Sequence, residues 1–424
     1  MQVWTFIVDN IFRNPPILMG LVATLGSILL QKKWNDILKA AVLAAVGMLM
    51  INVGVDLLSQ SITPVNIVFR AVNGVELPVG LDAASFSAEF GGDIGMAMLL
   101  GMVIHLLIAR FTPVKTIFLT GHFLYWIPFT FVAAGLEAGF DGVALIVFGA
   151  IFAALYWSFM PWVMRKYVWA VTGDESWMIG HPTGMLSMIA GTVSRFVGDK
   201  RKSTEDLKIP ESLSFLKDVN IISVFVIAIM YIILDVVFAG GVTEYSQRNI
   251  VFYALQMGIT FAVGLQILLA GVRMLINQIV PAFEGISRKL VPNAKPAYDV
   301  PMIFPYRPNA LIIGFVIGLL ASVPSLLIIN YTGLFGLFVV PLVFKCFFEL
   351  GTAAIIADGQ GGLRGTIIGT AVAAFVMMFF AGYSVMIFDN TIQNLLLSSG
   401  GDDKSVFGSI AYWIGILLNS IGIG

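Results

Sequence analysis

The side chains best suited to chemistry in this chain are a few ionisable residues set in apolar sequence. Only three histidines occur, and two of them directly follow a glycine: His122 in KTIFLTGHFLYW and His181 in MIGHPTGM. A glycine leaves room for a ligand to approach the backbone, so both histidines are candidates for binding a polar ligand. The alternative is a structural histidine that only caps a helix end. His105 lies among Leu and Ile, and we expect it to be structural.

One carboxylate stands out because prolines flank it. Asp299 lies between Pro296 and Pro301 in the stretch PAYDVPMIFPYRPNAL. Prolines break a helix and free carbonyl groups that need partners, and a carboxylate at such a break suits the hydroxyl groups of a sugar. Pairing with the nearby Arg307 is the alternative interpretation.

Three other acidic residues are weaker candidates. Asp82 lies in VGLDAASFS, Glu349 follows an aromatic pair, and Glu284 is placed to pair with Arg288 on one helix face. No HExxH spacing occurs, and the single Cys346 excludes a cysteine-based metal site. We therefore expect no metal and no cofactor.

The elements that hold these residues must lie in a membrane. Of the 424 residues, 58% are hydrophobic and 12% are charged, whereas soluble domains carry about 25% charged residues. The net charge of −1 gives no basic field for nucleic acid. The mixed residues 1–14 do not resemble a cleavable signal peptide, so the first apolar helix is expected to direct insertion.

Apolar runs of about 20 residues, the length that crosses a bilayer, predict an all-α membrane protein of about eleven transmembrane helices. The expected spans are 15–31, 38–58, 93–109, 116–136, 142–164, 219–240, 248–275, 308–330, 332–347, 365–388 and 406–424.

Lys and Arg gather in every second loop, which predicts cytoplasmic sides for those loops. The N-terminus is then outside and the C-terminus cytosolic, in a multi-pass protein of the cytoplasmic membrane. Lys345 counts among the cytosolic markers, and Asp402 and Asp403 count among the acidic residues of an outer loop.

Two short Gly-rich segments, 174–192 and 349–363, are too short to cross and too apolar for free loops. They favour re-entrant hairpins buried in protein. The patch GQGGLRG at 359–365 lacks the spacing of a phosphate-binding loop, so we interpret it as tight hairpin packing. The polar stretch 195–218 is expected to be a cytosolic linker between two halves.

The chain resembles itself at an offset of 217 residues. Gly54-Val55-x-x-Leu58, followed by Ile62 and Pro64, matches Gly271-Val272-x-x-Leu275, followed by Ile279 and Pro281, and Asp82 falls on Asp299. Five spans separate the copies, so they are inverted in the membrane. Inverted repeats are a recurrent transporter design, with the substrate near the midplane between the repeats.

The motifs AFEGISRKLVPNA, KTIFLTGH, the isolated IGH and the opening NPPILMGLVATLGSILLQK resemble the L-ascorbate-specific IIC component of the bacterial phosphotransferase system. The resemblance covers nearly the whole chain. It implies a homodimer in which a V-shaped dimerisation domain, here 1–58 and 219–275, holds a core of 59–194 and 276–405 that moves like an elevator. Residues 195–218 would be the linker and 406–424 the C-terminal helix.

The same resemblance implies a site and partners. Its two pocket histidines match His122 and His181, and its pocket aspartate matches Asp299. Two pocket glutamines are replaced by Trp126 and Pro182, and a pocket tyrosine aligns near Asp82. A separate IIB protein would phosphorylate the sugar, with IIA supplying the phosphoryl group from phosphoenolpyruvate.

We therefore expect a membrane transport subunit, with no catalytic phospho-accepting residue of its own, that moves L-ascorbate or a related sugar or sugar acid. The two replaced glutamines leave the sugar open. The alternative is an ion-coupled secondary transporter of a small polar solute that uses Asp82 and Asp299 as ion carriers. A channel and a membrane-embedded enzyme fit the sequence less well.

Overall fold

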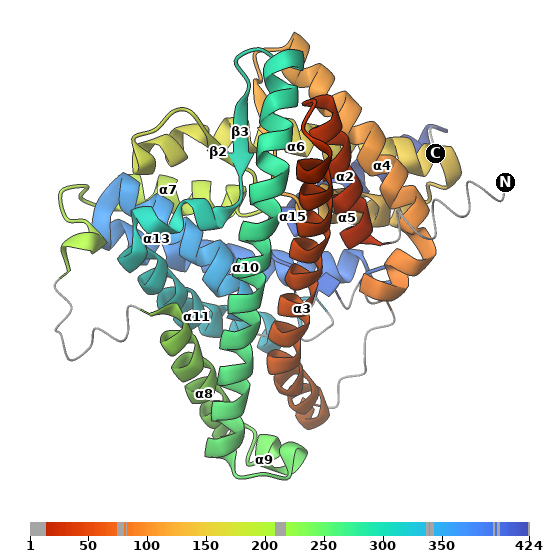
Figure 1. Cartoon of the computed structure of the whole chain (residues 1–424). Coiled ribbons are helices and arrows are strands. Elements are labelled where there is room, and N and C mark those ends of the chain that lie inside the picture. The colour runs from red at the N-terminus through yellow and green to blue at the C-terminus, as the bar shows by residue number, and fades with distance from the viewer. Residues whose placement is uncertain are drawn as a thin grey trace.

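The structure is a computed structural model that describes residues 14–73, 80–81, 83–207, 218–335, 339, 343–392, 395–396 and 399–422. These residues form mostly helices, as the sequence predicts (Figure 1). Asp82 lies outside the described residues, and so do the side chain of Glu284 and residues 336–338 and 340–342 of the predicted span 332–347.

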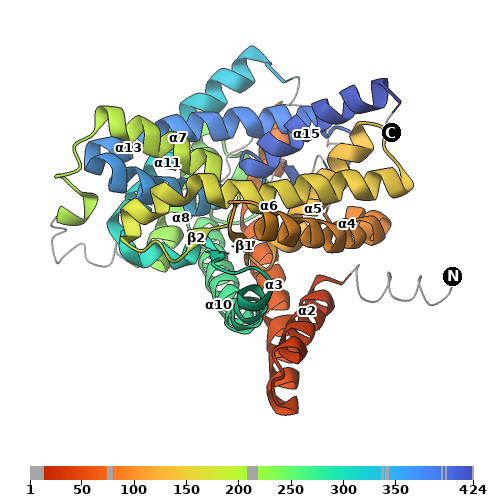
Figure 2. The ribbon, with the colours of Figure 1, turned by 90° about the horizontal axis from the view of Figure 1, so that it is seen from above.

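Five helices form a group that we call the arm. They are α2 (Pro15–Leu29), α3 (Trp34–Asn73), α8 (Val219–Val237), α9 (Gly241–Ser246) and α10 (Ile250–Leu290). The two long helices α3 and α10 lie side by side and cross the direction of α6 and α13 (Figures 1 and 2). Because they run on to Asn73 and Leu290, the expected domain boundaries at 58 and 275 fall inside continuous helices.

Glycines let α3 and α10 approach closely. Gly47 packs against Gly271, and Gly54 packs against Gly264. A Cβ atom at any of these four positions would meet backbone atoms of the facing helix, which is how small residues bring membrane helices together.

The remaining helices form the core, with dense packing inside this group and sparse contact with the arm among the described residues. They are α4 (Ala83–Phe111), α5 (Phe123–Glu137), α6 (Gly142–Thr172), α7 (Gly184–Val197), α11 (Pro308–Thr332), α12 (Val343–Lys345), the π-helical turn η6 (Cys346–Leu350), α13 (Gly351–Ile387) and α15 (Asp403–Ser420). Short 3-10 turns η2 (Thr204–Asp206), η4 (Val300–Met302) and η5 (Phe304–Tyr306) join them.

Helix α13 is a hairpin of two helical halves. Its backbone leaves helical geometry at Gly361 and Gly362, where Gly362 has φ +61°. The chain reverses there, since α7 packs against both halves of the hairpin. Gly191 packs against Ile356 of the first half, and Ala190 packs against Gly369 of the second half. The Gly-rich patch is therefore closely packed backbone, as expected.

A small parallel sheet interrupts the helical core. Strand β3 (Lys295–Tyr298) lies between β1 (Thr116–Phe118) and β2 (Met178–Ile179), with Phe118 and Met178 both paired with Ala297. The predicted span 116–136 is wrong in residues 116–122, because residues 116–118 pair with β3 and the helix starts only at Phe123.

Seven helices among the described residues are long and apolar enough to cross a membrane. They are Trp34–Val65, Ser85–Phe111, Gly142–Thr172, Asn220–Val237, Ile250–Ile279, Pro308–Thr332 and Cys346–Ile387. Three shorter apolar helices, Met19–Leu29, Phe123–Glu137 and Gly184–Val197, accompany them. The expected total of eleven spans stays a prediction.

Candidate functional site

The three strands place the three strongest candidate residues together. His122 comes four residues after β1, His181 two residues after β2 and Asp299 directly after β3. Since the strands are parallel, their carboxyl ends meet at one edge of the sheet. Three residues that are distant from one another in the sequence therefore share a site that no single helix could build.

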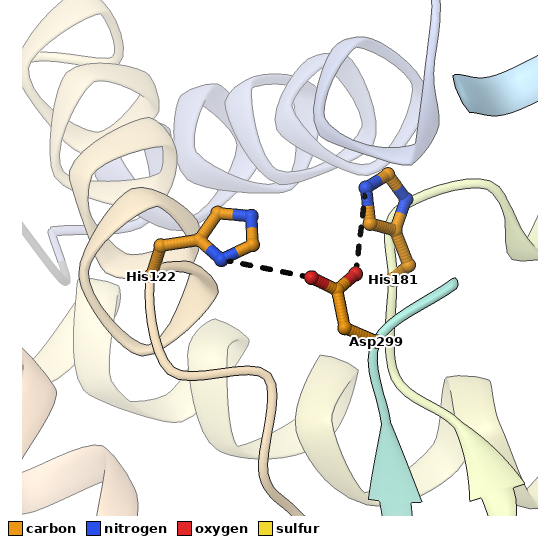
Figure 3. A group of neighbouring side chains, drawn as sticks. All are labelled: His122, His181 and Asp299. Carbon is orange, nitrogen blue, oxygen red and sulfur yellow. Dashed lines mark ion pairs between the residues drawn. The ribbon is translucent and has the colours of Figure 1, made fainter. Parts of the chain in front are cut away.

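The side chains of His122, His181 and Asp299 face one another (Figure 3). His122 Nδ1 lies 3.9 Å from Asp299 Oδ2, and His181 Nε2 lies 3.8 Å from Asp299 Oδ1. Both separations exceed ordinary hydrogen-bond length. His181 and Asp299 are buried, while the side chain of His122 keeps 13% of its surface exposed, so His122 is the most exposed of the three.

Local structure fixes the side chain of Asp299 and leaves that of His122 available. Asp299 caps the turn η4, and its Oδ1 accepts a hydrogen bond from Val300 N at 2.8 Å. His122 is the N-cap residue of α5 without a side-chain capping bond, so its ring is available to the site. The ring of Phe123 packs against both histidines, with centroids 4.2 Å from His122 and 4.8 Å from His181.

The two residues that replace the expected glutamines differ in their surroundings. Trp126 lies one turn along α5 from His122 and packs against Tyr125 and Phe129. Pro182 is buried, and its carbonyl accepts a hydrogen bond from Asp403 N at 2.9 Å. Proline at this position offers no side-chain polar group to a ligand.

Glu349, a weak candidate in the sequence, lies beside the site. Its Oε2 is 3.3 Å from His181 Nδ1. His181 therefore has a carboxylate near each of its ring nitrogens, Glu349 on one side and Asp299 on the other.

A buried ionic cluster continues from Glu349 and was missed by sequence reasoning. Lys345 Nζ lies 3.0 Å from Glu349 Oε1, and Lys345 and Lys404 both pair with Asp402 Oδ2. The interpretation of Lys345, Asp402 and Asp403 as loop charges is wrong, because all three are buried. Buried charges persist only when they are paired and hydrogen-bonded, and this cluster supplies the pairs.

The sequence contained one usable signal for this cluster. Lys345 and Glu349 stand at i and i+4, the spacing of an ion pair on one helix face. No pattern in the sequence connects them with residues 402–404, because those residues lie at the start of a different helix, α15.

The remaining candidates are accounted for by structural contacts. His105 is buried, with Nδ1 2.8 Å from Ser158 Oγ and Nε2 accepting from Phe118 N, so its structural role is confirmed. Arg307 pairs with Asp358 at 2.7 Å and not with Asp299, which removes the alternative partner proposed for Asp299.

The nitrogen and oxygen atoms of the site residues suit either a metal ion or a small polar molecule. The ligand atoms of His122, His181 and Asp299 lie within 4.8 Å of one another, a spacing that also fits a metal ion. The aromatic ring of Phe123 packs on both imidazoles. An apolar ring beside hydrogen-bonding groups is the composition of a small-molecule pocket.

Comparison with known protein families decides the class. The sequence model of the "PTS system sugar-specific permease component" family, EIIC-GAT, matches residues 10–416. The chain belongs to this family. The EIIC assignment is consistent with the several apolar helices, which suggest a multi-pass cell-membrane protein.

A relative with a named function has the same class. The chain is 22% identical over 446 aligned positions to the "Ascorbate-specific PTS system EIIC component" of Mycoplasma pneumoniae, covering 91% of this chain and 67% of the relative. EIIC components work with IIB and IIA partners and a sugar substrate, and the expected resemblance is confirmed.

Proposed function

We propose that this EIIC protein binds L-ascorbate or a related sugar or sugar acid between His122, His181 and Asp299 and carries it across the membrane. The observation that carries the proposal is the convergence of three polar side chains at the ends of three strands, with gaps of 3.8 and 3.9 Å between them. Polar groups held in a membrane core without direct bonds to one another are functional candidates.

The chemistry of the three residues selects hydroxyl groups. An ionised Asp299 only accepts hydrogen bonds, and each neutral imidazole offers one acceptor and one donor. A hydroxyl group donates and accepts at once, so between His122 and Asp299 it can donate to the carboxylate and accept from a protonated imidazole nitrogen, across a gap too long for direct contact.

Phosphorylation would make the transport vectorial. A separate IIB protein, recharged by IIA, would transfer a phosphoryl group to the sugar on the cytosolic side, and the added charge would prevent its return. This chain would contribute binding and movement, and the transferred group would never be attached to it.

The division into arm and core supports an elevator-type movement. The two groups pack densely inside themselves and touch sparsely. One contact lies next to the site, where a Cβ at Gly121 would meet Leu275 and Ile279 of α10. A small residue at this surface is what sliding of the core along α10 requires.

The helix order supports an inverted repeat. At the offset of 217 residues, α3 falls on α10, α4 on α11, α5 on α12, η6 and the first turn of α13, α6 on the part of α13 after Gly362, and α7 on α15. Gly47 and Gly54 fall on Gly264 and Gly271. Each packs on the repeat mate of the other, the reciprocal pattern that a two-fold axis between α3 and α10 produces.

A homodimer formed through the arm is part of the proposal. Asp56 on α3 and Arg273 on α10 are exposed among apolar side chains such as Val53 and Val263. A charged side chain facing lipid is costly, so burial of this surface against a second copy is favoured. In the orientation that the loop charges predict, residues 80–81 would lie outside and residues 198–206 in the cytosol.

Binding by purified protein tests this function. Isothermal titration against L-ascorbate, galactitol and pentitols is expected to give one saturable site for one of them, and His122→Ala is expected to remove it. Unchanged binding by the His122→Ala variant would exclude this residue from the site.

Uptake into vesicles separates the proposal from the ion-coupled alternative. With phosphorylated IIB present, labelled sugar is expected to accumulate as its phosphate. Accumulation driven by a pH gradient without IIB and IIA would contradict the proposal and favour ion coupling.

A further inference from the structure

The cluster behind the site contains more charge than helix packing needs. Five ionisable side chains are buried together: Lys345, Glu349, Asp402, Asp403 and Lys404. Replacing such a cluster with apolar residues of similar size is often neutral or stabilising. Stability alone therefore explains the buried cluster poorly. Its contacts with the site explain it better.

The cluster holds the turn that carries His181 from both sides. Asp403 accepts hydrogen bonds from Gly184 N at 3.0 Å and Met185 N at 2.9 Å, and so caps the start of α7. On the other side, Thr183 Oγ1 donates to Glu349 O at 3.0 Å. The backbone around His181 is thus fixed relative to Glu349.

Glu349 divides its two oxygens between a cation and His181. Lys345 Nζ donates to Oε1, while Oε2 faces His181 Nδ1. Neither Oε2 nor Nδ1 has another hydrogen-bond partner among the described residues. A small rotation of either side chain across their 3.3 Å separation completes a bond between them.

Lys345 decides which atom carries the proton of that bond. A buried carboxylate beside an ammonium group stays ionised, and an ionised carboxylate only accepts hydrogen bonds. The proton must then lie on His181 Nδ1. In a neutral imidazole this leaves Nε2 without hydrogen, as an acceptor that points toward Asp299 and the gap.

We propose that Lys345 is a positioning residue that acts through Glu349 to keep His181 in the Nδ1-protonated form, so that the site presents two acceptors, His181 Nε2 and Asp299 Oδ1, to one hydroxyl donor of the ligand. The inference rests on the proposed sugar site. It adds that the group bound between these two atoms must be a hydrogen-bond donor, which a carboxylate or ether oxygen of a substrate cannot be.

The form of His181 can be measured in the native protein without a ligand. Solid-state NMR of protein labelled with 15N-histidine distinguishes a protonated from a bare ring nitrogen, and the chain has only three histidines. The signals of His181 are assigned by their loss in His181→Gln. We expect a protonated Nδ1 and a bare Nε2. The opposite form, or protonation of both nitrogens, overturns the proposal even where no sugar has yet been found to bind.

A pair of lysine variants separates positioning from packing. In Lys345→Met, Glu349 loses its cation and takes up a proton, so it becomes the donor and the NMR signature of His181 reverses. Lys404→Met is the matched control, because Lys404 is also buried and pairs with Asp402 but makes no bond to Glu349. It is expected to leave the signature unchanged. The same response in both variants would contradict the proposal.

Ligand affinity gives the second readout. Loss of one acceptor in the site is expected to weaken sugar binding about tenfold in Lys345→Met, while Lys345→Arg, which keeps the cation, restores the native affinity and signature. Native affinity in Lys345→Met together with a reversed signature would show that Nε2 does not bind the sugar. If Lys345→Met does not fold, the signature of the native protein still decides.

Discussion

Asp299 is the residue on which both histidines converge, and it has two functions that can be separated. Its Oδ1 caps the turn η4 through Val300 N, and its two oxygens face His181 and His122. Asparagine caps turns and helices about as well as aspartate. Replacing aspartate with asparagine therefore removes the charge and keeps the cap.

Asp299→Asn is expected to weaken sugar binding by roughly tenfold to a hundredfold, the effect of about 1.5–3 kcal/mol for a hydrogen bond to a charged group. Its thermal unfolding should match that of the native protein. Titration calorimetry and a thermal scan on the same preparation check both. An unchanged dissociation constant would mean that Asp299 only caps the turn.

At the scale of elements, the three parallel strands bring His122, His181 and Asp299 together at one edge of the sheet. The sequence predicted His122, His181 and Asp299 because each interrupts an apolar pattern, beside glycine or proline. It did not predict the sheet, because strands of two to four residues are too short to show a periodicity of two. Lys345 and Asp402 were misplaced for a related reason: burial of a charge depends on a partner that is distant in sequence.

The hairpin of α13 depends on the backbone of Gly362. This residue has φ +61°, and an added Cβ would fall against the carbonyl groups of Asp199 and Lys202. Gly333 also has φ +61° but nothing lies within 4 Å of its Cβ position, so it isolates the cost of the backbone conformation, of order 1 kcal/mol.

Gly333→Ala is expected to lower stability by about 1 kcal/mol, and Gly362→Ala by clearly more, because the close backbone contacts must also open. The yield of folded protein in detergent and its unfolding temperature measure the difference. Equal effects in the two variants would show that the chain reversal at Gly362 tolerates a side chain.

The contact between core and arm gives a prediction about movement. A Cβ at residue 121 would lie 2.7 Å from Cδ2 of Leu275 on α10. Gly121→Val is expected to slow transport at least tenfold, because the core must slide past α10. The affinity for sugar should change little, since the valine faces α10.

Leu275→Ala in the Gly121→Val protein reopens the space and is expected to restore part of the transport rate. Vesicle uptake and equilibrium binding, measured on the single and double variants, separate rate from affinity. Native uptake by Gly121→Val would contradict movement at this surface.

At the scale of the whole molecule, the exposed charges of the arm predict an assembly of two copies. In detergent, the protein part of the complex is expected to have twice the chain mass of 45.9 kDa. Light scattering, with the mass of the detergent subtracted, measures it. Arg273→Glu, on the exposed face of α10, is expected to shift the protein toward monomer. Arg248→Glu, at an exposed position before α10, is the matched control. A monomeric native protein would remove the arm as a dimer surface.

The sequence predicted the mostly helical architecture, because apolar runs are a property of composition and spacing, whereas the repeat indicated by the Gly-Val motif stays a prediction. Helix ends were harder to predict, since α3 and α10 continue through Pro64 and Pro281. Proline usually ends a helix, and neighbouring helices inside a membrane protein offset that cost.

A structure of the protein with bound sugar tests the central claim most directly. Purified protein would be incubated with the sugar that gives a calorimetric signal, and its density located by cryo-electron microscopy. We predict sugar hydroxyl groups within hydrogen-bond distance of Asp299, of His181 Nε2 and of His122. Sugar density elsewhere, with these three side chains still 3.8–3.9 Å apart and no ligand between them, would contradict it.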